Sequence, residues 1–275
     1  MMLQSMFRFP GFLTRACTLS YDDGVRDDIR LVEIMRKYGI KGTFNLNTKN
    51  MLRKSERCLS AEECIELYGD DMEVALHGYR HLRLENHPSY LSLRDVIANR
   101  EHLENTFGKV IRGMAYAYGT YDESVVEMLR MSGIAYSRTT LSTGSFDFPE
   151  EWLTLHPTCH HKDPRLFELV DAFLAEPTPS NWKTRVPKLF YLWGHSYEFP
   201  RDDNWDVIER FCEIMGNSDN VWKATNIELY NYIKAFYSVN FSLDGKYAEN
   251  LSSIDVYMNA DGKDVIVKAG ETVKL

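Results

Sequence analysis

Residues 15–24 read RACTLSYDDG, a mainly apolar run that ends in two aspartates and a glycine. The run predicts a buried strand over residues 15–20, because short apolar runs bounded by turn residues are typical of strands in parallel sheets. A helix over residues 27–38 is predicted next, with apolar residues at helical spacing and Gly39 as its stop. A strand that leads directly into a helix predicts an α/β fold with a mainly parallel sheet.

The same alternation continues through most of the chain. One later helix carries a predicted capping box, formed by Ser60 and Glu63. The further predicted strands are 41–46, 72–76, one within 111–118, and 188–193. The further predicted helices are 60–67, 92–107, 124–131, 205–215 and 225–236.

The C-terminal part of the sequence changes character. It has alternating apolar and polar runs, with Asp244-Gly245 and Asp261-Gly262 at hairpin-turn positions. No linker rich in Pro, Gly or Ser precedes it. We therefore expect residues 1–236 to form the main α/β unit and residues 237–275 a small antiparallel β extension, packed on that unit because so short a segment buries little core of its own.

Composition limits the class of protein. The chain has 275 residues, 44% of them apolar, and a net charge of −8, so it can bury a full core but lacks the clustered positive face of a nucleic-acid binder. Its five cysteines include no CxxC pair, which indicates reduced thiols. No apolar run is long enough to span a membrane, and residues 1–12 do not read as a signal peptide. We expect a cytoplasmic protein with no nucleic-acid or membrane partner; the sequence indicates no oligomeric state.

Polar groups follow directly on four of the predicted strands. In a β/α barrel the carboxyl ends of the strands meet on one face, where binding and catalytic sites are built. Groups that are distant in sequence are therefore expected to share one pocket. In chain order they are Asp22 with Asp23, His77 with His81, Tyr116 with Tyr118, and His195 after Gly194.

Two imidazoles and a carboxylate among these groups suit a divalent metal ion and leave positions open for water and substrate. His77 and His81 are four residues apart and can face one ion from a single turn. Their spacing alone is equally compatible with an ordinary surface pair. The four strand-end groups taken together favour the metal site.

A second pair with the same spacing is formed by His156 and His160, with His161 next along the chain. Pro157 interrupts this segment. A surface loop is its simplest interpretation. Lining of the pocket by His160 and a rival metal site are the functional alternatives.

Several of these segments together resemble the polysaccharide deacetylase family, also known as carbohydrate esterase family 4 or the NodB homology group. Residues 19–24 are similar to its first motif, which usually reads TFDDG, and residues 73–81 to its second, with two histidines four apart. Residues 116–119 and 192–195 resemble the third and last motifs. The third motif usually opens with an arginine, and here that position is Ala115. The resemblance covers roughly residues 15–235 and implies a distorted (β/α)7 barrel, followed here by the small C-terminal β extension.

The resemblance also implies a role for each group. The metal would be zinc by default, with cobalt, nickel or manganese as alternatives. Asp23, His77 and His81 would hold it, Asp22 would be the general base, His195 the general acid, and the backbone N–H of Tyr118 part of an oxyanion hole. Substrate-binding candidates are Tyr116, Tyr118, Trp193, Trp152 and His160.

The expected function is hydrolysis of an acetyl group from an N-acetylated or O-acetylated carbohydrate. One alternative is an amidohydrolase that acts on a non-sugar amide. A second alternative is a non-catalytic, metal-containing relative that binds sugar. Asp22 and His195 favour catalysis, because simple binding needs neither a base nor an acid.

Overall fold

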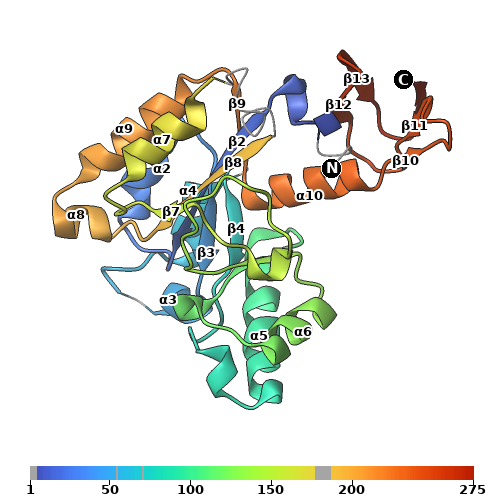
Figure 1. Cartoon of the computed structure of the whole chain (residues 1–275). Helices are drawn as coiled ribbons and strands as arrows, with labels where there is room; N and C mark the ends of the chain where they lie inside the picture. Colours follow the sequence, from blue (N-terminus) through green and yellow to red (C-terminus); the bar gives the residue numbers. More distant parts are fainter. Residues whose placement is uncertain (1–4, 54, 70, 177–186) are drawn as a thin grey trace.

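The structure, a computed structural model, describes residues 5–53, 55–69, 71–176 and 187–275 (Figure 1). Its centre is a parallel sheet with the strand order β6-β5-β4-β3-β2-β8-β7, and β9 pairs in addition with β2. The α/β class and the parallel sheet predicted from the sequence are confirmed. The strands are β2 (Arg15–Asp22), β3 (Thr43–Leu46), β4 (Glu73–Leu76), β5 (Gly113–Ala115), β6 (Tyr136–Arg138), β7 (Cys159–His160), β8 (Lys188–Gly194) and β9 (Val221–Lys223).

The two edges of this sheet are joined by one segment of chain. Leu155 forms a parallel bridge with Arg138 at the end of β6. A few residues later, β7 pairs with β8. The segment 155–160 thus links β6 to β8 and curls the sheet into the predicted distorted barrel, which is confirmed.

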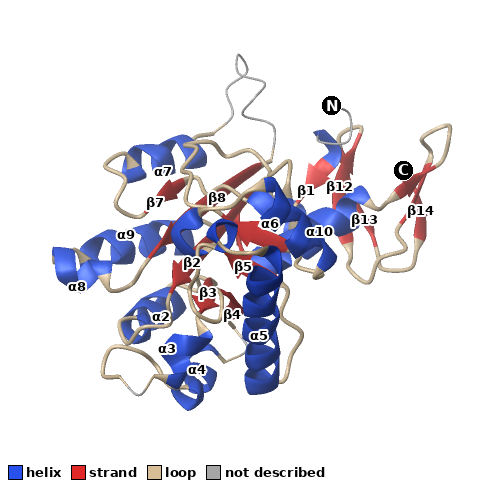
Figure 2. Cartoon of the chain, turned by 90° about the horizontal axis from the view of Figure 1, so that it is seen from below, coloured by secondary structure: helices blue, strands red, loops and turns tan. Residues whose placement is uncertain are grey.

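Helices lie around the sheet, as Figure 2 shows from below. The predicted helices are found with small shifts at their ends, and the Ser60–Glu63 capping box is present. The helices are α2 (Asp28–Lys37), α3 (Thr48–Leu52), α4 (Ala61–Tyr68), α5 (Ser89–Phe107), α6 (Glu123–Met131), α7 (Leu166–Leu174), α8 (Glu198–Asp202), α9 (Trp205–Gly216) and α10 (Asn226–Tyr237), with short 3-10 turns η2 (Leu84–Asn86), η3 (Ala117–Gly119) and η4 (Trp152–Thr154).

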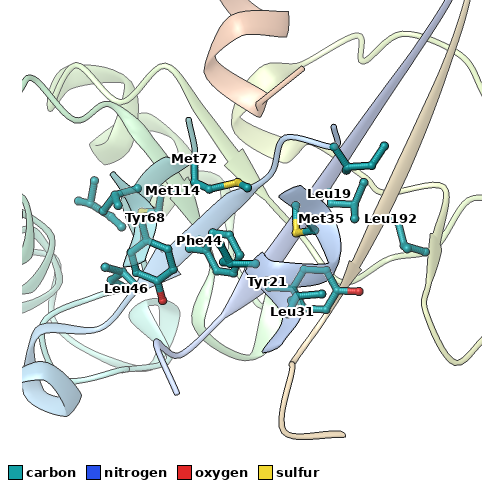
Figure 3. Close-up of a cluster of buried hydrophobic side chains, with 14 of the residues drawn as sticks. Leu19, Tyr21, Leu31, Met35, Phe44, Leu46, Tyr68, Met72, Met114 and Leu192 are labelled. Carbon is teal, nitrogen blue, oxygen red and sulfur yellow. The ribbon is translucent and has the colours of Figure 1, made fainter. Parts of the chain in front are cut away.

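Alternate residues of β2 enter two different environments, as the pleat of a strand requires. Leu19 and Tyr21 belong to the apolar core between sheet and helices, where Figure 3 shows them near Leu31, Met35 and Leu192. The residues between them point into the barrel, where the packing is polar. Thr18, Ser20 and Asp22 of β2 and Asn45 of β3 are buried there.

The β extension contains residues from both ends of the chain. One sheet has the order β1-β12-β13 and the other β10-β11-β14, and both lie beside α10 (Figure 1). The strands are β1 (Phe7–Arg8), β10 (Asn240–Phe241), β11 (Tyr247–Glu249), β12 (Val256–Ala260), β13 (Lys263–Val267) and β14 (Thr272–Lys274). The hydroxyl of Tyr232 on α10 donates to Arg8 O and accepts from Tyr257 N, and so ties both ends to the helix. The division of the chain at residue 237 stays a prediction.

Among the residues that the structure describes, no helix combines the length and the apolar character needed to cross a membrane.

Candidate metal centre and catalytic groups

The predicted strand-end groups lie together at the carboxyl edge of the sheet. Asp22 is the last residue of β2, His77 follows β4, and His195 follows β8. Asp22 Oδ2 lies 3.7 Å from His77 Nε2 and 3.9 Å from His195 Nε2. The barrel therefore places groups from three strands, far apart in the sequence, around one point.

Three of these side chains have the arrangement of a metal site. His77 Nε2 and His81 Nε2 are 3.1 Å apart, and Asp23 Oδ1 lies 3.9 Å and 3.8 Å from them. Ligand atoms at such separations can all reach one ion at the roughly 2 Å bond lengths of zinc. Asp23, His77 and His81 therefore fit a divalent metal.

The tautomer of His77 supports this fit. Its Nδ1 lies 2.9 Å from the carbonyl oxygen of Ala115, and an imidazole nitrogen facing a carbonyl must carry the proton. Nε2 is then left with a free lone pair that points at His81. A hydrogen bond from the second nitrogen to a backbone carbonyl is the usual way in which proteins orient a metal-binding histidine.

The backbone is strained at this site. Asp23, His81 and Tyr118 have φ angles of 83°, 57° and 61°, in the left-handed region that side chains rarely occupy. Three of the six such non-glycine residues in the described chain thus lie at one place. Strain of this kind persists where the surrounding structure enforces it, and it is concentrated at functional sites.

Helix α5 fixes the loop that carries both histidines. Asn99 accepts a hydrogen bond from the backbone N–H of His77 at 3.1 Å. Asp95 accepts from the backbone N–H of Tyr79 at 2.9 Å and pairs with the Arg80 side chain at 2.8 Å. Both of these α5 side chains are buried, so the loop rests on a rigid base.

Asp22 is held on both carboxylate oxygens. Asn45 Nδ2 donates to Oδ1 at 2.9 Å, and Arg138 Nη2 forms an ion pair with Oδ2. Burial would raise the pKa of Asp22, but the charges of Arg138, His77 and His195 outweigh it and lower the pKa to about 2. Asp22 is therefore ionised at neutral pH.

Arg138 lies beside Ala115, the position at which the third motif usually has an arginine. The two residues are paired neighbours on β6 and β5. The Arg138 side chain is fully buried, and its guanidinium lies 4.5 Å from the centre of the Trp193 ring. The pairing of β5 with β6 thus brings an arginine next to Ala115, and this arginine contacts Asp22.

His195 has a carboxylate partner in Glu198, three residues along the chain. Glu198 Oε2 lies 3.5 Å from His195 Nδ1 and accepts from the His195 backbone N–H at 3.4 Å. Burial lowers the pKa of His195, but Glu198 together with Asp22 and Asp23 more than compensates, so the net shift is upward. His195 is therefore suited to carry a proton near neutral pH.

Glu198 also lies among other cationic or imidazole groups. His160 Nε2 is 3.0 Å and His161 Nε2 3.4 Å from Oε2, while Arg201 Nη2 is 3.2 Å from Oε1. This second set of potential ligands does not suit a metal ion. His160 Nδ1 accepts from Lys162 N at 3.1 Å, which leaves the proton on Nε2, and the guanidinium would repel a cation.

The predicted substrate-binding residues fall into two groups. Tyr118 is 53% exposed and its ring centre lies 4.5 Å from that of His81, while Trp193 contacts His160 and His195. Tyr116 and Trp152 are not brought to this face. The Tyr116 hydroxyl is bonded to Leu153 O, and Trp152 packs against Tyr230 of α10. His156 lies apart as well, 2.6 Å from the Thr139 hydroxyl.

Three residues of the site were not predicted: Asn45, Arg138 and Glu198. Asn45 had a signal, because it is a polar residue in the middle of an apolar strand. The spacing of three residues between His195 and Glu198, which is typical of neighbours on a helical turn, could have identified Glu198. No local sequence pattern could have identified Arg138, since β6 is only three residues long and was not predicted.

Comparison with known proteins places the chain beside deacetylases. Residues 13–137 match the family model described as polysaccharide deacetylase. No curated protein matches the sequence. Among solved structures, an allantoinase, Puue, is 14% identical over 81% of this chain and 91% of that chain, with a TM-score of 0.63. A family 4 carbohydrate esterase from Streptomyces lividans, in complex with acetate, is 11% identical over 77% and 93%, with a TM-score of 0.50.

A Streptococcus pyogenes deacetylase, PplD, in complex with acetate, is 20% identical. That alignment spans only 50% of this chain and 61% of the other, with a TM-score of 0.47. At these identities the likeness to solved structures concerns the fold.

Proposed function

We propose that this chain, in which residues 13–137 match the polysaccharide deacetylase family model, is a metal-dependent hydrolase that releases acetate from an acetylated carbohydrate. The observation that carries the proposal is the convergence of Asp23, His77 and His81 with Asp22 and His195 at one edge of the sheet. Each of the last two has its own charged partner. A protein that only binds sugar would need neither an ionised Asp22 nor a protonated His195.

Asp23 Oδ1, His77 Nε2 and His81 Nε2 would hold the ion. A divalent metal bound there supplies Lewis acidity, which polarises the acetyl carbonyl and lowers the pKa of water. The borderline donor set favours zinc, with cobalt, nickel or manganese as alternatives.

Asp22 would take the proton from the attacking water. Its carboxylate is ionised because Arg138 compensates its burial, and Asn45 fixes its orientation. The backbone N–H of Tyr118 would donate to the oxyanion that develops on the acetyl group, where a fixed donor stabilises the transition state most.

His195 would then donate a proton to the leaving nitrogen or oxygen. The bond between the acetyl carbon and that atom breaks, the hydroxyl of water stays on the carbon, and the products are acetate and the free amine or alcohol. Glu198 favours the charged form of the imidazole and engages Nδ1, so that Nε2 is left facing Asp22 and the reacting group.

A second candidate is hydrolysis of a small amide that is not a sugar. The fold similarity to an allantoinase, at a TM-score of 0.63, favours keeping it. The catalytic groups would act in the same way, and only the substrate pocket would differ.

Acetate release from a panel of substrates tests the proposal. The protein is stripped with a chelator, resupplied with zinc, cobalt, nickel or manganese, and assayed on N-acetyl oligosaccharides, acetylated xylan and a small cyclic amide. We expect acetate from a saccharide only with metal, and none from Asp23→Asn. The Asp202→Asn variant, changed on the exposed surface, is the matched control. Turnover of the small amide alone would favour the second candidate.

A further inference from the structure

Tyr118 forms an aromatic wall at the edge of the metal site. Its ring meets the ring of His81 edge to face, at 69°. The left-handed backbone at Tyr118 fixes the direction of this side chain, and 53% of it remains exposed. The exposed ring therefore lies next to any substrate bound at the metal site.

Arg83 covers the Tyr118 ring. Its guanidinium carbon lies 4.5 Å from the ring centre, which is a cation–π contact. The backbone at Arg83 is also fixed. Its carbonyl accepts from Asn86 N at 3.1 Å and from His87 Nδ1 at 2.9 Å, and the next residue, Leu84, is buried.

This guanidinium is held in place without an acidic partner. Within the described ranges, no carboxylate lies within ion-pair distance of Arg83, whereas Arg80 on the same loop is paired with Asp95 at 2.8 Å. Stacking on a ring engages the face of a guanidinium and leaves its N–H edge free. That edge matches a carboxylate in shape and can form two parallel hydrogen bonds.

We propose that Arg83 binds a carboxylate of the substrate, so that the acetylated carbohydrate is an acidic one. The carboxylate would belong to the sugar unit that carries the reacting acetyl group or to its neighbour, because a single aromatic ring separates Arg83 from the metal ligand His81. This inference rests on the proposed function and names the substrate class. The net charge of −8 gives no long-range attraction for an acidic polymer, so local pairing has to provide the recognition.

The test compares an acidic N-acetylated oligosaccharide with its carboxyl-reduced form, which has the same length and linkage. We expect kcat/KM of the wild-type protein to be about tenfold higher for the acidic form, the scale of one charge-assisted hydrogen bond. Arg83→Gln should abolish this preference, because it should lower kcat/KM for the acidic form far more than for the reduced form. Arg83→Lys should keep only part of it, since an ammonium lacks the planar fork.

Arg210→Gln is the matched control, because Arg210 also stacks on an aromatic ring, that of Phe167, at 4.0 Å. Binding of the acidic oligosaccharide to metal-free wild-type and Arg83→Gln proteins, measured by calorimetry, gives a readout that needs no turnover. Equal wild-type kcat/KM for both forms, or equal binding by both proteins, would overturn the inference. Acetate release from both forms at equal rates would overturn the role of Arg83 and still support the proposed function. Release from neither form would contradict the proposed function itself.

Discussion

Arg138 and Asp22 form a charged pair that solvent does not reach. A buried charge that loses its partner keeps its desolvation cost and gains nothing in return, which destabilises the fold. We expect Arg138→Gln to lower the free energy of unfolding by about 3 kcal/mol in urea titrations. The double variant Arg138→Gln with Asp22→Asn should recover part of that loss. Additive losses in the double variant would show that the two side chains do not interact.

Glu198 gives a kinetic prediction at the same scale. Because it contributes to the raised pKa of His195, Glu198→Gln should lower that pKa. Catalysis needs the protonated imidazole, so the alkaline limb of the pH profile of kcat/KM should move to lower pH. The activity lost at pH 8 should then exceed the activity lost at pH 6. Asp202→Asn, on the same helix, should leave the profile in place, and an unmoved limb in Glu198→Gln would exclude this role.

Site residues could be predicted from the sequence only where they directly follow a strand that the sequence itself predicts. Asp23, His77 and His81 each follow a recognisable strand, and the barrel brings such positions together whatever lies between them. Arg138 depends instead on the register of β6 against β5, which no local pattern in residues 136–138 records. Tyr116 and Trp152 differ from the expectation for a related reason, because their aromatic character fits a core as well as a sugar-binding surface.

At the scale of secondary structure, the start of β4 is joined to the start of α10 by a buried carboxyl group. Glu73 accepts hydrogen bonds from Tyr136 at 2.6 Å, from Thr43 at 2.9 Å and from the Ile227 backbone N–H at 2.8 Å. Burial raises the pKa of Glu73 to about 7, although these bonds act in the opposite direction. The folded protein therefore holds this proton more tightly than the unfolded chain.

This linkage predicts a pH dependence of stability. Since the folded pKa lies above the value of 4.5 for a free glutamate, the contribution of Glu73 is complete below pH 4.5 and is lost as the pH rises to about 7. Compared with Glu73→Gln, the wild type should lose up to about 3 kcal/mol of unfolding free energy between pH 5 and 8. Parallel curves for the two proteins in chemical denaturation would contradict the raised pKa. The exposed Glu213→Gln should follow the wild type.

The longest elements were predictable, and several short ones were not. The helices α2, α5 and α10 are long enough for their apolar spacing to appear, and β2 and β8 are continuous apolar runs. Strands β6 and β7 have three and two residues and depend on their neighbours for pairing. The strand predicted within residues 111–118 is found at Gly113–Ala115, and the left-handed backbone at Tyr118 lies beyond its end.

At the scale of the whole molecule, the barrel and the β extension share one apolar cluster. It contains Phe7 and Phe236 from the region assigned to the barrel and Met258 from the extension. Met258 is fully buried, so Met258→Ala should lower the free energy of unfolding by about 3 kcal/mol. Thermal unfolding should stay a single transition, with kcat/KM unchanged. The exposed Leu251→Ala serves as control, and two separate transitions would support an independent domain after residue 236.

The pairing of β1 with β12 also has a consequence for how the protein is made. Phe7 and Met258 are partners in this sheet, although almost the whole chain separates them. A ribosome adds roughly 5–20 residues per second, so Phe7 leaves it tens of seconds before its partner exists. During synthesis Phe7 of β1 has no strand to pair with, and this part of the fold can form only once translation is nearly complete. The nascent chain is therefore the stage at which this protein is most exposed to aggregation and to capture by chaperones.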